Sequence, residues 1–234
     1  MRKFIVEDAF WELFPQAKIG IVIAENLSNV YGYKQAYSEM LIDAQKQAVK
    51  HLTSDTLSEN KVIKVWRDAF QKFKTKKSAR SSIEALLKRV SKSNAVGTIN
   101  PLVDIYNSCS MRYALPNGGE DIDKFDGDVR LTFAEGNEDF VTLGSEKSEP
   151  PLEDELIYKD DAGAICRCWN WREAVRTMLT EETKNAFLCI ESVDSERNDD
   201  FNSALAYLQE NVTYKLGAKC KVFVLDINNR YIEF

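Results

Sequence analysis

The feature that most constrains the fold is the stretch at residues 98–121, TINPLVDIYNSCSMRYALPNGGED. Asn100 precedes Pro101, an order typical of a helix start. Proline at the first helical position loses no hydrogen bond, and asparagine caps the exposed N–H groups. Apolar residues such as Leu102 and Ile105 then recur at helical spacing. The sequence therefore predicts a helix that begins at Asn100 and buries one face.

The end of this stretch, LPNGGED, predicts a tight turn that carries two carboxylates. Pro116, Gly118 and Gly119 favour a turn, and glycines without Cβ atoms let another group approach the backbone closely. Glu120 and Asp121 follow at once. A solvated acidic turn after a capped helix explains the pattern as readily as a binding site does, so the residues alone leave both interpretations open.

A second polar and aromatic stretch, CRCWNWREAVRT at residues 166–177, is expected to form the opposite wall of one pocket. Asn170 lies between two tryptophans, and Arg167 and Arg172 flank this group. These three side chains could orient a carboxylate, phosphate or amide, since the arginine fork suits planar recognition. The alternative is a core corner in which the indole N–H groups find partners.

The pair Cys166 and Cys168 lacks the two further soft ligands that a zinc site needs, and it is not a C-x-x-C redox motif. Strand alternation predicts that both cysteines lie on one face of a strand, with Arg167 on the other face. We therefore expect two small strand residues here.

Composition excludes several classes of protein. The 234 residues are 44% hydrophobic and 29% charged, which fits one large domain or two small ones. Five cysteines at irregular spacing favour a reduced, cytoplasmic protein. No signal peptide is apparent, and no apolar run approaches the ~20 residues that span a bilayer, so we expect no membrane association. His51 is the only histidine, which excludes a multi-histidine metal site, and we expect no metal and no cofactor.

Apolar periodicity over the rest of the chain predicts an α+β fold. Helices are expected at residues 34–52, 59–73, 81–92 and 199–212. Strands are expected at residues 3–25 (two, around Pro15), 128–133, 140–143, 156–158, 164–168, 185–192, and in a final pair at 221–225 and 231–234. Ser81 and Glu84 have capping-box spacing. A soft boundary near residue 95 separates a helix-rich part from a sheet-rich remainder.

One basic cluster, at residues 72–80, stands out in a chain whose formal net charge is -6. Lysine and arginine side chains attract a nucleic-acid backbone independently of base sequence. The candidate contacts are Lys74, Lys76, Lys77 and Arg80. An ordinary solvated loop is an equal alternative.

Taken together, these stretches resemble the editing domain of the phenylalanyl-tRNA synthetase β subunit, the B3/B4 domain, in its free-standing form. The matching motifs are NPLVDIYN at 100–107, LPNGGED at 115–121, the strand and turn around 128–144, CRCWNWR at 166–172 and EETKN before the 185–192 strand. The resemblance covers roughly residues 78–195. It implies one B3/B4-like domain over 1–234, with a helix-rich part at 1–95. A sheet-rich part at 96–234, with a mixed or antiparallel β core and flanking helices, would carry the pocket.

The resemblance also implies a function. The pocket would accept the 3′ aminoacyl-adenosine of a mischarged tRNA and hydrolyse its ester. Asn100 matches the asparagine that lines the synthetase pocket, with Asp104 and Asn107 close by. A synthetase glutamate that reads a hydroxyl on the wrong amino acid has Glu191 as its nearest counterpart, two residues beyond the matching position at Cys189. The synthetase histidine falls at about Gly118 here, so no histidine is expected to take part.

Three hypotheses follow. In the first, the chain is a trans-editing hydrolase that binds the aminoacylated 3′ end of tRNA. Asn100 and the backbone near Gly118 and Gly119 would hold the attacking water, and Arg167 or Arg172 would stabilise developing charge. Substrate would also meet residues of both walls, namely Asp104, Asn107, Glu120, Asp121, Asn170 and Glu191. In the second, the same pocket is a non-catalytic binding module for an amino acid or small metabolite.

In the third, the chain is an enzyme acting on another substrate, and the acidic turn at residues 120–123 could hold a divalent cation. The amino acid, the tRNA, the catalytic base and the oligomeric state are left open.

Overall fold

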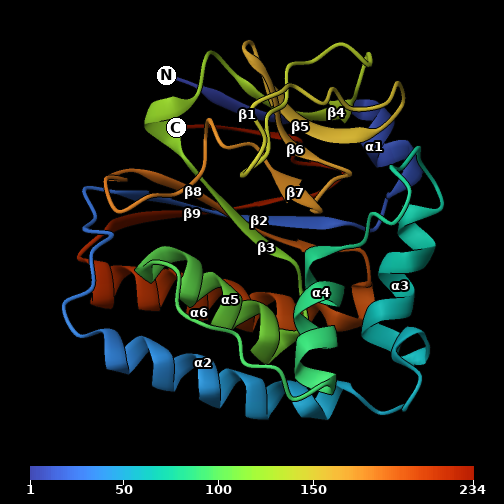
Figure 1. Ribbon diagram of the computed structural model, residues 1–234. Helices are drawn as coiled ribbons and strands as arrows, with labels where there is room; N and C mark the ends of the chain where they lie inside the picture. Colours follow the sequence, from blue (N-terminus) through green and yellow to red (C-terminus); the bar gives the residue numbers. More distant parts are fainter.

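The computed structural model describes all 234 residues and contains ten strands and six helices (Figure 1). The strands are β1 (Lys3–Val6), β2 (Lys18–Glu25), β3 (Asn117–Asp121), β4 (Val129–Phe133), β5 (Leu156–Asp160), β6 (Gly163–Arg167), β7 (Arg172–Glu173), β8 (Ala186–Ser192), β9 (Lys219–Leu225) and β10 (Tyr231–Glu233). The helices are α1 (Asp8–Leu13), α2 (Lys34–Ala48), α3 (Lys61–Phe70), α4 (Ser82–Ser91), α5 (Pro101–Tyr113) and α6 (Asn198–Leu216).

Two β-sheets stack face to face, and α5 and α6 cover the outer side of the smaller one (Figure 1). The larger sheet has the order β10-β1-β4-β5-β6-β7, in which only β1 and β4 run parallel. The smaller sheet, β3-β8-β2-β9, is antiparallel throughout. Helix α2 packs on α5 as an outermost layer. The predicted α+β class, with mixed and antiparallel strands, is confirmed. None of the helices combines the length and the apolar character that crossing a bilayer requires.

Strand β2 is buried on both faces. Ile19, Ile21 and Ile23 join the core between the two sheets, whereas Val22 and Ala24 join the core beneath the helices. Because both faces are covered, the strand reads as an unbroken apolar run rather than an alternating one. Strands β1 and β2 also show that the residues before position 95 supply one strand to each sheet.

Helix α5 begins as its sequence predicts. The side chain of Asn100 accepts a hydrogen bond from the backbone N–H of Val103, and Pro101 is the first helical residue. The helix ends at Ala114, whose backbone is left-handed. The chain then turns directly into the smaller sheet.

The predicted glycine turn at residues 115–121 is wrong, because most of it is strand β3. Gly119 is required there by packing rather than by a turn. A Cβ atom at this position would lie 2.6 Å from Leu188 Cδ2 and 2.9 Å from Leu179 Cδ1. The carboxylates of Glu120 and Asp121 are therefore buried rather than solvated.

Four smaller expectations also need correction. Residues 8–13 form helix α1 instead of a strand, because Phe10 and Phe14 lie one helical turn apart on its buried side. Residues 140–143 are not a strand. Strands β9 and β10 do not pair as a hairpin; each joins a different sheet, beside β2 and β1. Ser81 does not cap α4, and Glu84 instead forms a bidentate ion pair with Arg67.

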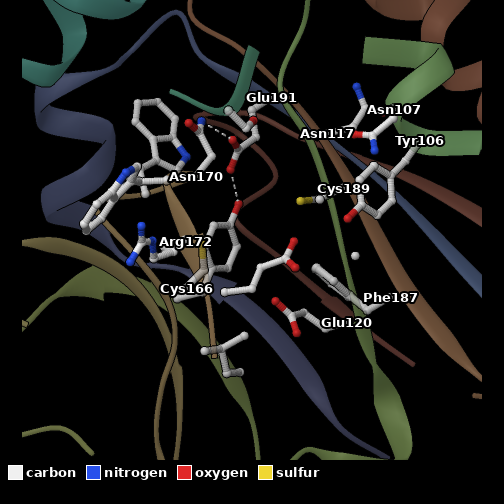
Figure 2. A pocket seen from close by; sticks show the side chains of 18 of the residues that line it. Tyr106, Asn107, Asn117, Glu120, Cys166, Asn170, Arg172, Phe187, Cys189 and Glu191 are labelled. Carbon is white, nitrogen blue, oxygen red and sulfur yellow. Dashed lines mark hydrogen bonds between the residues drawn. The ribbon is translucent and has the colours of Figure 1, made fainter. Parts of the chain in front are cut away.

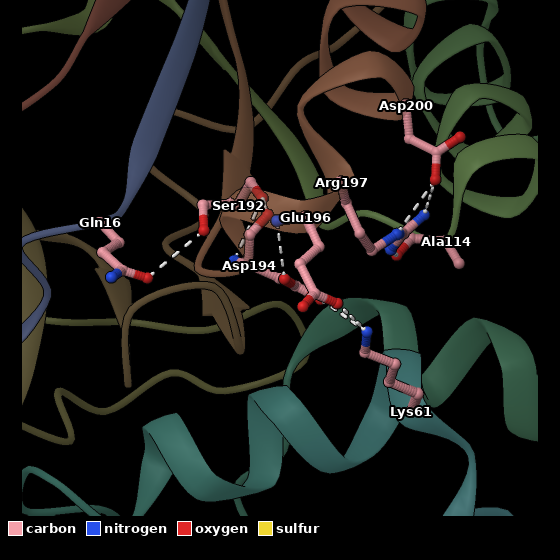
Figure 3. A network of polar contacts seen from close by, with 9 residues as sticks. Gln16, Lys61, Ala114, Ser192, Asp194, Glu196, Arg197 and Asp200 are labelled. Carbon is pink, nitrogen blue, oxygen red and sulfur yellow. Dashed lines mark hydrogen bonds and ion pairs between the residues drawn. The ribbon is translucent and has the colours of Figure 1, made fainter.

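A polar network fixes the entry into α6 (Figure 3). Asp194 accepts a hydrogen bond from the backbone N–H of Glu196, and Glu196 pairs with Lys61 of α3. Arg197 pairs with Asp200 and donates to the backbone carbonyl of Ala114 at the end of α5. The network thus joins the end of β8 to the end of α5, the two elements that flank the cavity described below.

We predict different effects for two neighbouring glycine substitutions. Gly119→Ala should lower the free energy of unfolding by about 1–3 kcal/mol, because the added methyl group overpacks against two buried leucines. Gly118→Ala is the matched control, since its Cβ would meet nothing closer than 3.6 Å. Urea unfolding of both variants tests this. Equal losses of stability would contradict the packing argument.

Candidate functional site

A cavity of about 370 Å³ lies between the two sheets (Figure 2). Its lining comes from β3 and β8 of the smaller sheet, from β4, β5 and β6 of the larger sheet, and from the segment at residues 169–173. Parts of α4 and α5 complete the lining near its mouth, where Ala85 and Arg172 are exposed. Most of the remaining lining is apolar, which makes its polar side chains informative.

The two stretches that the sequence singles out do form walls of this one cavity. The first contributes Tyr106, Asn107 and residues 117–120, and the second contributes Cys166 and residues 169–173. They belong to different sheets and meet only because the sheets stack. The predicted two-walled pocket therefore exists.

Glu191 is held at one end of the cavity by two donors. The Tyr158 hydroxyl donates to its Oε1 atom, and the Asn170 side-chain amide donates to Oε2 at 2.5 Å. Burial raises the pKa of Glu191 to about 7, although both hydrogen bonds favour its charged form. Glu191 thus changes protonation near neutral pH.

Strand alternation explains why both Cys189, the position that matches the synthetase glutamate, and Glu191 reach the cavity. Cys189 and Glu191 are two residues apart on β8, so they share one face with Phe187. The other face, with Leu188 and Ile190, packs against the helices. The two-residue offset between Cys189 and Glu191 therefore moves the carboxyl group along one cavity wall and does not remove it from the cavity.

Two further carboxyl groups line the cavity. Glu120 projects from β3, and Glu173 projects from β7. A Cβ atom built on Gly118 would lie 3.6 Å from Oε1 of Glu173. Burial raises the pKa of Glu173 to about 7, opposed by the backbone N–H of Gly119. Burial, and then the charge of Glu173, raise the pKa of Glu120 above its usual range.

Sequence reasoning missed Glu173. The residue directly follows Arg172, and alternation along β7 would have placed the two on opposite faces. Arg172 points outward and is exposed, while the Glu173 carboxyl faces the cavity. Alternation therefore shows that one of these two side chains faces inward, but the sequence does not show which one.

The cavity holds no reactive thiolate. Burial raises the pKa of Cys166 and of Cys189 well above the usual range of a thiol, so both remain neutral. No group of three or more His, Cys, Asp or Glu side chains is arranged to hold a metal ion. The carboxyl groups are therefore the remaining acid–base candidates in the cavity.

Several predicted site residues lie outside the cavity, with their hydrogen-bonding capacity used by the protein. Asn100 caps α5, accepts from Asn29 and donates to the carbonyl of Leu179. Asp104 accepts from the Tyr31 hydroxyl at 2.6 Å and from the backbone N–H of Ile99 at 2.8 Å. These contacts fix the start of α5, so Asn100 and Asp104 are positioned as supporting residues.

Asp121 is likewise outside the cavity. It accepts from the Thr183 hydroxyl at 2.8 Å and from the backbone N–H of Asp123 at 3.0 Å. The side chain of Asn107, by contrast, lines the cavity (Figure 2). His51 contacts the carbonyl of Arg112 at the far end of α5 and takes no part in the cavity.

The two arginines of the second wall differ sharply. Arg167 is buried on the face of β6 opposite Cys166, and it forms a bidentate ion pair with Glu155 at 2.9 and 2.8 Å. Arg172 is exposed, with its guanidinium 4.8 Å from the ring centre of Trp171. Only Arg172 is placed to meet a ligand.

The expected alternation of Cys166 and Cys168 is wrong. The backbone is left-handed at Cys168 and at Trp169, with φ of 45° and 63°. This bend ends β6 and turns the chain toward the cavity. Cys168 accepts from the backbone N–H of Lys76 instead of facing the cavity.

The basic segment at residues 72–80 lies beside the second wall. Its Lys76 backbone contacts Cys168, and just beyond the segment the backbone N–H of Ser82 donates to the carbonyl of Asn170. Two of its four candidate side chains already face a carboxylate: Lys76 forms a solvent-accessible ion pair with Glu149, and Arg80 lies 3.8 Å from Glu84. The other two are Lys74 and Lys77. The segment thus brings positive charge to the side of the cavity that α4 borders.

The chain resembles known proteins over most of its length. A family model described as "B3/4 domain" matches residues 65–212. No curated protein matches the chain. A similar solved structure is the crystal structure of an N-terminal fragment of the phenylalanyl-tRNA synthetase beta-subunit from Pyrococcus horikoshii, at 13% identity and a TM-score of 0.46. That match covers 93% of this chain and 49% of the fragment, so the chain spans about half of the fragment's length.

The arginine geometry predicts a separation of stability effects. Arg167→Met leaves the buried carboxylate of Glu155 unpaired and should lower the free energy of unfolding by about 3–5 kcal/mol. Arg172→Met should change it by less than about 0.5 kcal/mol, because Arg172 is exposed. Chemical denaturation measures both. A double variant, Arg167→Met with Glu155→Gln, should recover part of the loss. Similar losses of stability in Arg167→Met and Arg172→Met would contradict this assignment.

Glu191 should make stability depend on pH. Its carboxyl has a pKa of about 7 in the folded chain against an ordinary 4.5, so the folded state binds the proton more tightly. Its contribution is fully present below pH 4.5 and is lost as pH rises through 7, by about 1.4 kcal/mol per pH unit in between. Glu191→Gln should flatten this part of the stability profile.

Unfolding by urea at several pH values between 4.5 and 8 tests this prediction. Glu146→Gln, at an exposed site, is the matched control and should leave the profile unchanged. Parallel profiles for the wild-type protein and Glu191→Gln would show that the carboxyl titrates at its ordinary pKa.

Proposed function

This chain belongs to the B3/4 domain family, and we propose that it is a trans-editing hydrolase that cleaves the aminoacyl ester of mischarged tRNA. The observation that carries the proposal is a set of buried carboxyl groups in an apolar cavity, with no cationic side chain paired to them. An aminoacyl ester supplies what such a cavity lacks, since it carries an ammonium group and a polarised carbonyl. The cavity volume of about 370 Å³ suits an aminoacyl group.

Glu191 is the proposed general base. A carboxylate with a pKa near the working pH is suited to removing a proton from water. The water oxygen attacks the carbonyl carbon, the ester C–O bond breaks, and the ribose oxygen of the tRNA takes up the proton. Tyr158 and Asn170 hold the carboxylate in place during this step. An ester is already activated, so the reaction requires no covalent intermediate.

The backbone at Gly118 and Gly119 lies along the cavity wall. Because Gly118 has no Cβ atom, space is left open beside Cys189. We assign the backbone N–H of Gly119 to the developing oxyanion, which would replace the Glu173 carboxyl as its acceptor in the reaction. Asn107 and Asn170 are the neutral polar groups that orient the substrate.

The mouth supplies contacts for the tRNA end. Trp171 and Arg172 form a stacked pair at the mouth that can receive the terminal base, because aromatic faces stack on any base. Lys74 and Lys77 are then available for backbone phosphates, while Lys76 would first have to leave Glu149 and Arg80 would have to leave Glu84.

The second candidate is a non-catalytic binding module for an amino acid or small metabolite. One observation favours it: both oxygens of Glu191 already accept a hydrogen bond within the protein, from Tyr158 and from Asn170, as a purely structural carboxyl group would. The same pocket residues serve either function, and only the basic segment separates them.

The test is a deacylation screen of the purified protein against a panel of correctly and incorrectly charged tRNAs. We expect rapid release from one mischarged class, and a rate about 10²–10⁴-fold lower in Glu191→Gln. Lys74→Ala with Lys77→Ala should raise KM and flatten its salt dependence. Lys46→Ala with Lys50→Ala, at the end of α2 and in the turn that follows it, should not, because neither residue lines the cavity. Release from no tRNA by folded protein would leave the binding module as the function.

A further inference from the structure

The Glu120 and Glu173 carboxyl groups form a feature that the proposed reaction leaves unexplained. Glu120 is 7% exposed, and its Oε2 atom is buried with no hydrogen-bond partner. It points into the cavity in Figure 2, which Glu173 also lines from the opposite sheet. An unpartnered buried carboxyl oxygen carries a substantial free-energy cost, so a partner for it is expected among the ligands of the cavity.

No cationic side chain forms an ion pair with either carboxyl group. The charge of Arg176 lowers the pKa of Glu120, but the guanidinium itself is bound to Asp160 through two hydrogen bonds of 3.0 and 2.6 Å. Arg172 turns outward and stacks on Trp171. The charge of Asp160 raises the pKa of Glu120 further. The remaining groups near the pair are neutral, and they are the thiols of Cys166 and Cys189 and the hydroxyls of Tyr106 and Thr177.

The contrast with Glu191 is informative. Glu191 has a donor on each carboxylate oxygen, whereas Glu120 has an open oxygen. In the strand register Glu120 lies opposite Phe187, four residues and about 13 Å along β8 from Glu191. The two ends of the cavity therefore differ: the carboxyl group at one end has its hydrogen bonds satisfied by the protein, and the carboxyl group at the other end has an oxygen without a partner.

We infer that Glu120 and Glu173 form a binding site for a primary ammonium group of the ligand. An ammonium group has three N–H donors and a positive charge, so it can satisfy the open oxygen of Glu120 and offset the repulsion between the buried Glu120 and the half-buried Glu173 carboxyl groups. A divalent cation is a poorer match, since the side chains are not arranged as a metal site.

This inference rests on the proposed function only for the identity of the ligand. In an aminoacyl ester the ammonium could be the α-amino group or the end of a basic side chain, and the two share the same chemistry. The site would then reject acyl groups that lack an ammonium, which makes Glu120 and Glu173 specificity-determining residues.

The test is calorimetric titration of the full chain with small amides. The probes are L-alaninamide, L-norleucinamide and L-lysinamide, each with its α-hydroxy counterpart in place of the α-amine. We expect at least one amine to bind. Replacing the ammonium that enters the site with a hydroxyl should weaken binding about 10- to 100-fold. The α-hydroxy analogue of lysinamide tells the two sources apart, because only a site for the side-chain ammonium would retain it.

Glu120→Gln and Glu173→Gln should each produce the same weakening, while Glu146→Gln on an exposed loop should not. Both substitutions remove like-charge repulsion, so thermal unfolding should show folded proteins of equal or greater stability. If no amine binds at millimolar concentration, if alaninamide and norleucinamide bind and their α-hydroxy counterparts bind equally, or if neither variant loses affinity, the inference is overturned.

The outcomes also separate this inference from the proposed function. Ammonium-dependent binding without deacylation of any tRNA would keep the site and refute the hydrolase. Equal hydrolysis of an aminoacyl-tRNA and of its α-hydroxyacyl and side-chain-neutral analogues would keep the hydrolase and refute the ammonium site.

Discussion

Burial of strand β8 on both faces is the constraint on which the rest of the site depends. Its even-numbered residues, such as Leu188 and Ile190, pack under the helices, and its odd-numbered residues face the cavity. A slip of one residue would place the Glu191 carboxyl in the apolar helix layer, at a large desolvation cost. The register is therefore fixed by the helix side, and the cavity side is free to carry polar groups.

That arrangement places stability and function in opposition. Three carboxyl groups lie in one cavity, and burial raises the pKa of each of them. A core made for stability alone would contain apolar side chains at these positions. The cap on α5, which is remote from the cavity, contributes stability in the opposite sense. Raised carboxyl pKa values of this kind are typical of a functional site.

Much of this could be predicted from sequence, for reasons that are local. Asn100 and Pro101 determine where α5 begins through the chemistry of a helix start. Glu191 and Asn170 were identifiable as polar residues within apolar or aromatic stretches, and the structure joins them by a hydrogen bond of 2.5 Å. The two walls were likewise marked by composition that a plain core does not have.

What could not be predicted depends on which elements become neighbours. Gly118 and Gly119 suggest a turn until β8 is known to lie beside them. Both are then strand residues, and Gly119 admits the close packing of two leucines. Arg167 suggested a ligand contact until Glu155, twelve residues earlier, was found to occupy its guanidinium. Glu173 was missed because its orientation is determined by a two-residue strand.

The central claim is that the carboxyl-lined cavity between the sheets holds the acyl part of the ligand. The most direct measurement is a crystal structure of the protein with a non-hydrolysable 3′-aminoacylamino-adenosine. We expect the adenine beside Trp171 and Arg172, the carbonyl near Gly118, and an ammonium group within hydrogen-bond distance of Glu120 or Glu173. An analogue bound elsewhere on the protein, with the cavity closed to it, would contradict the account.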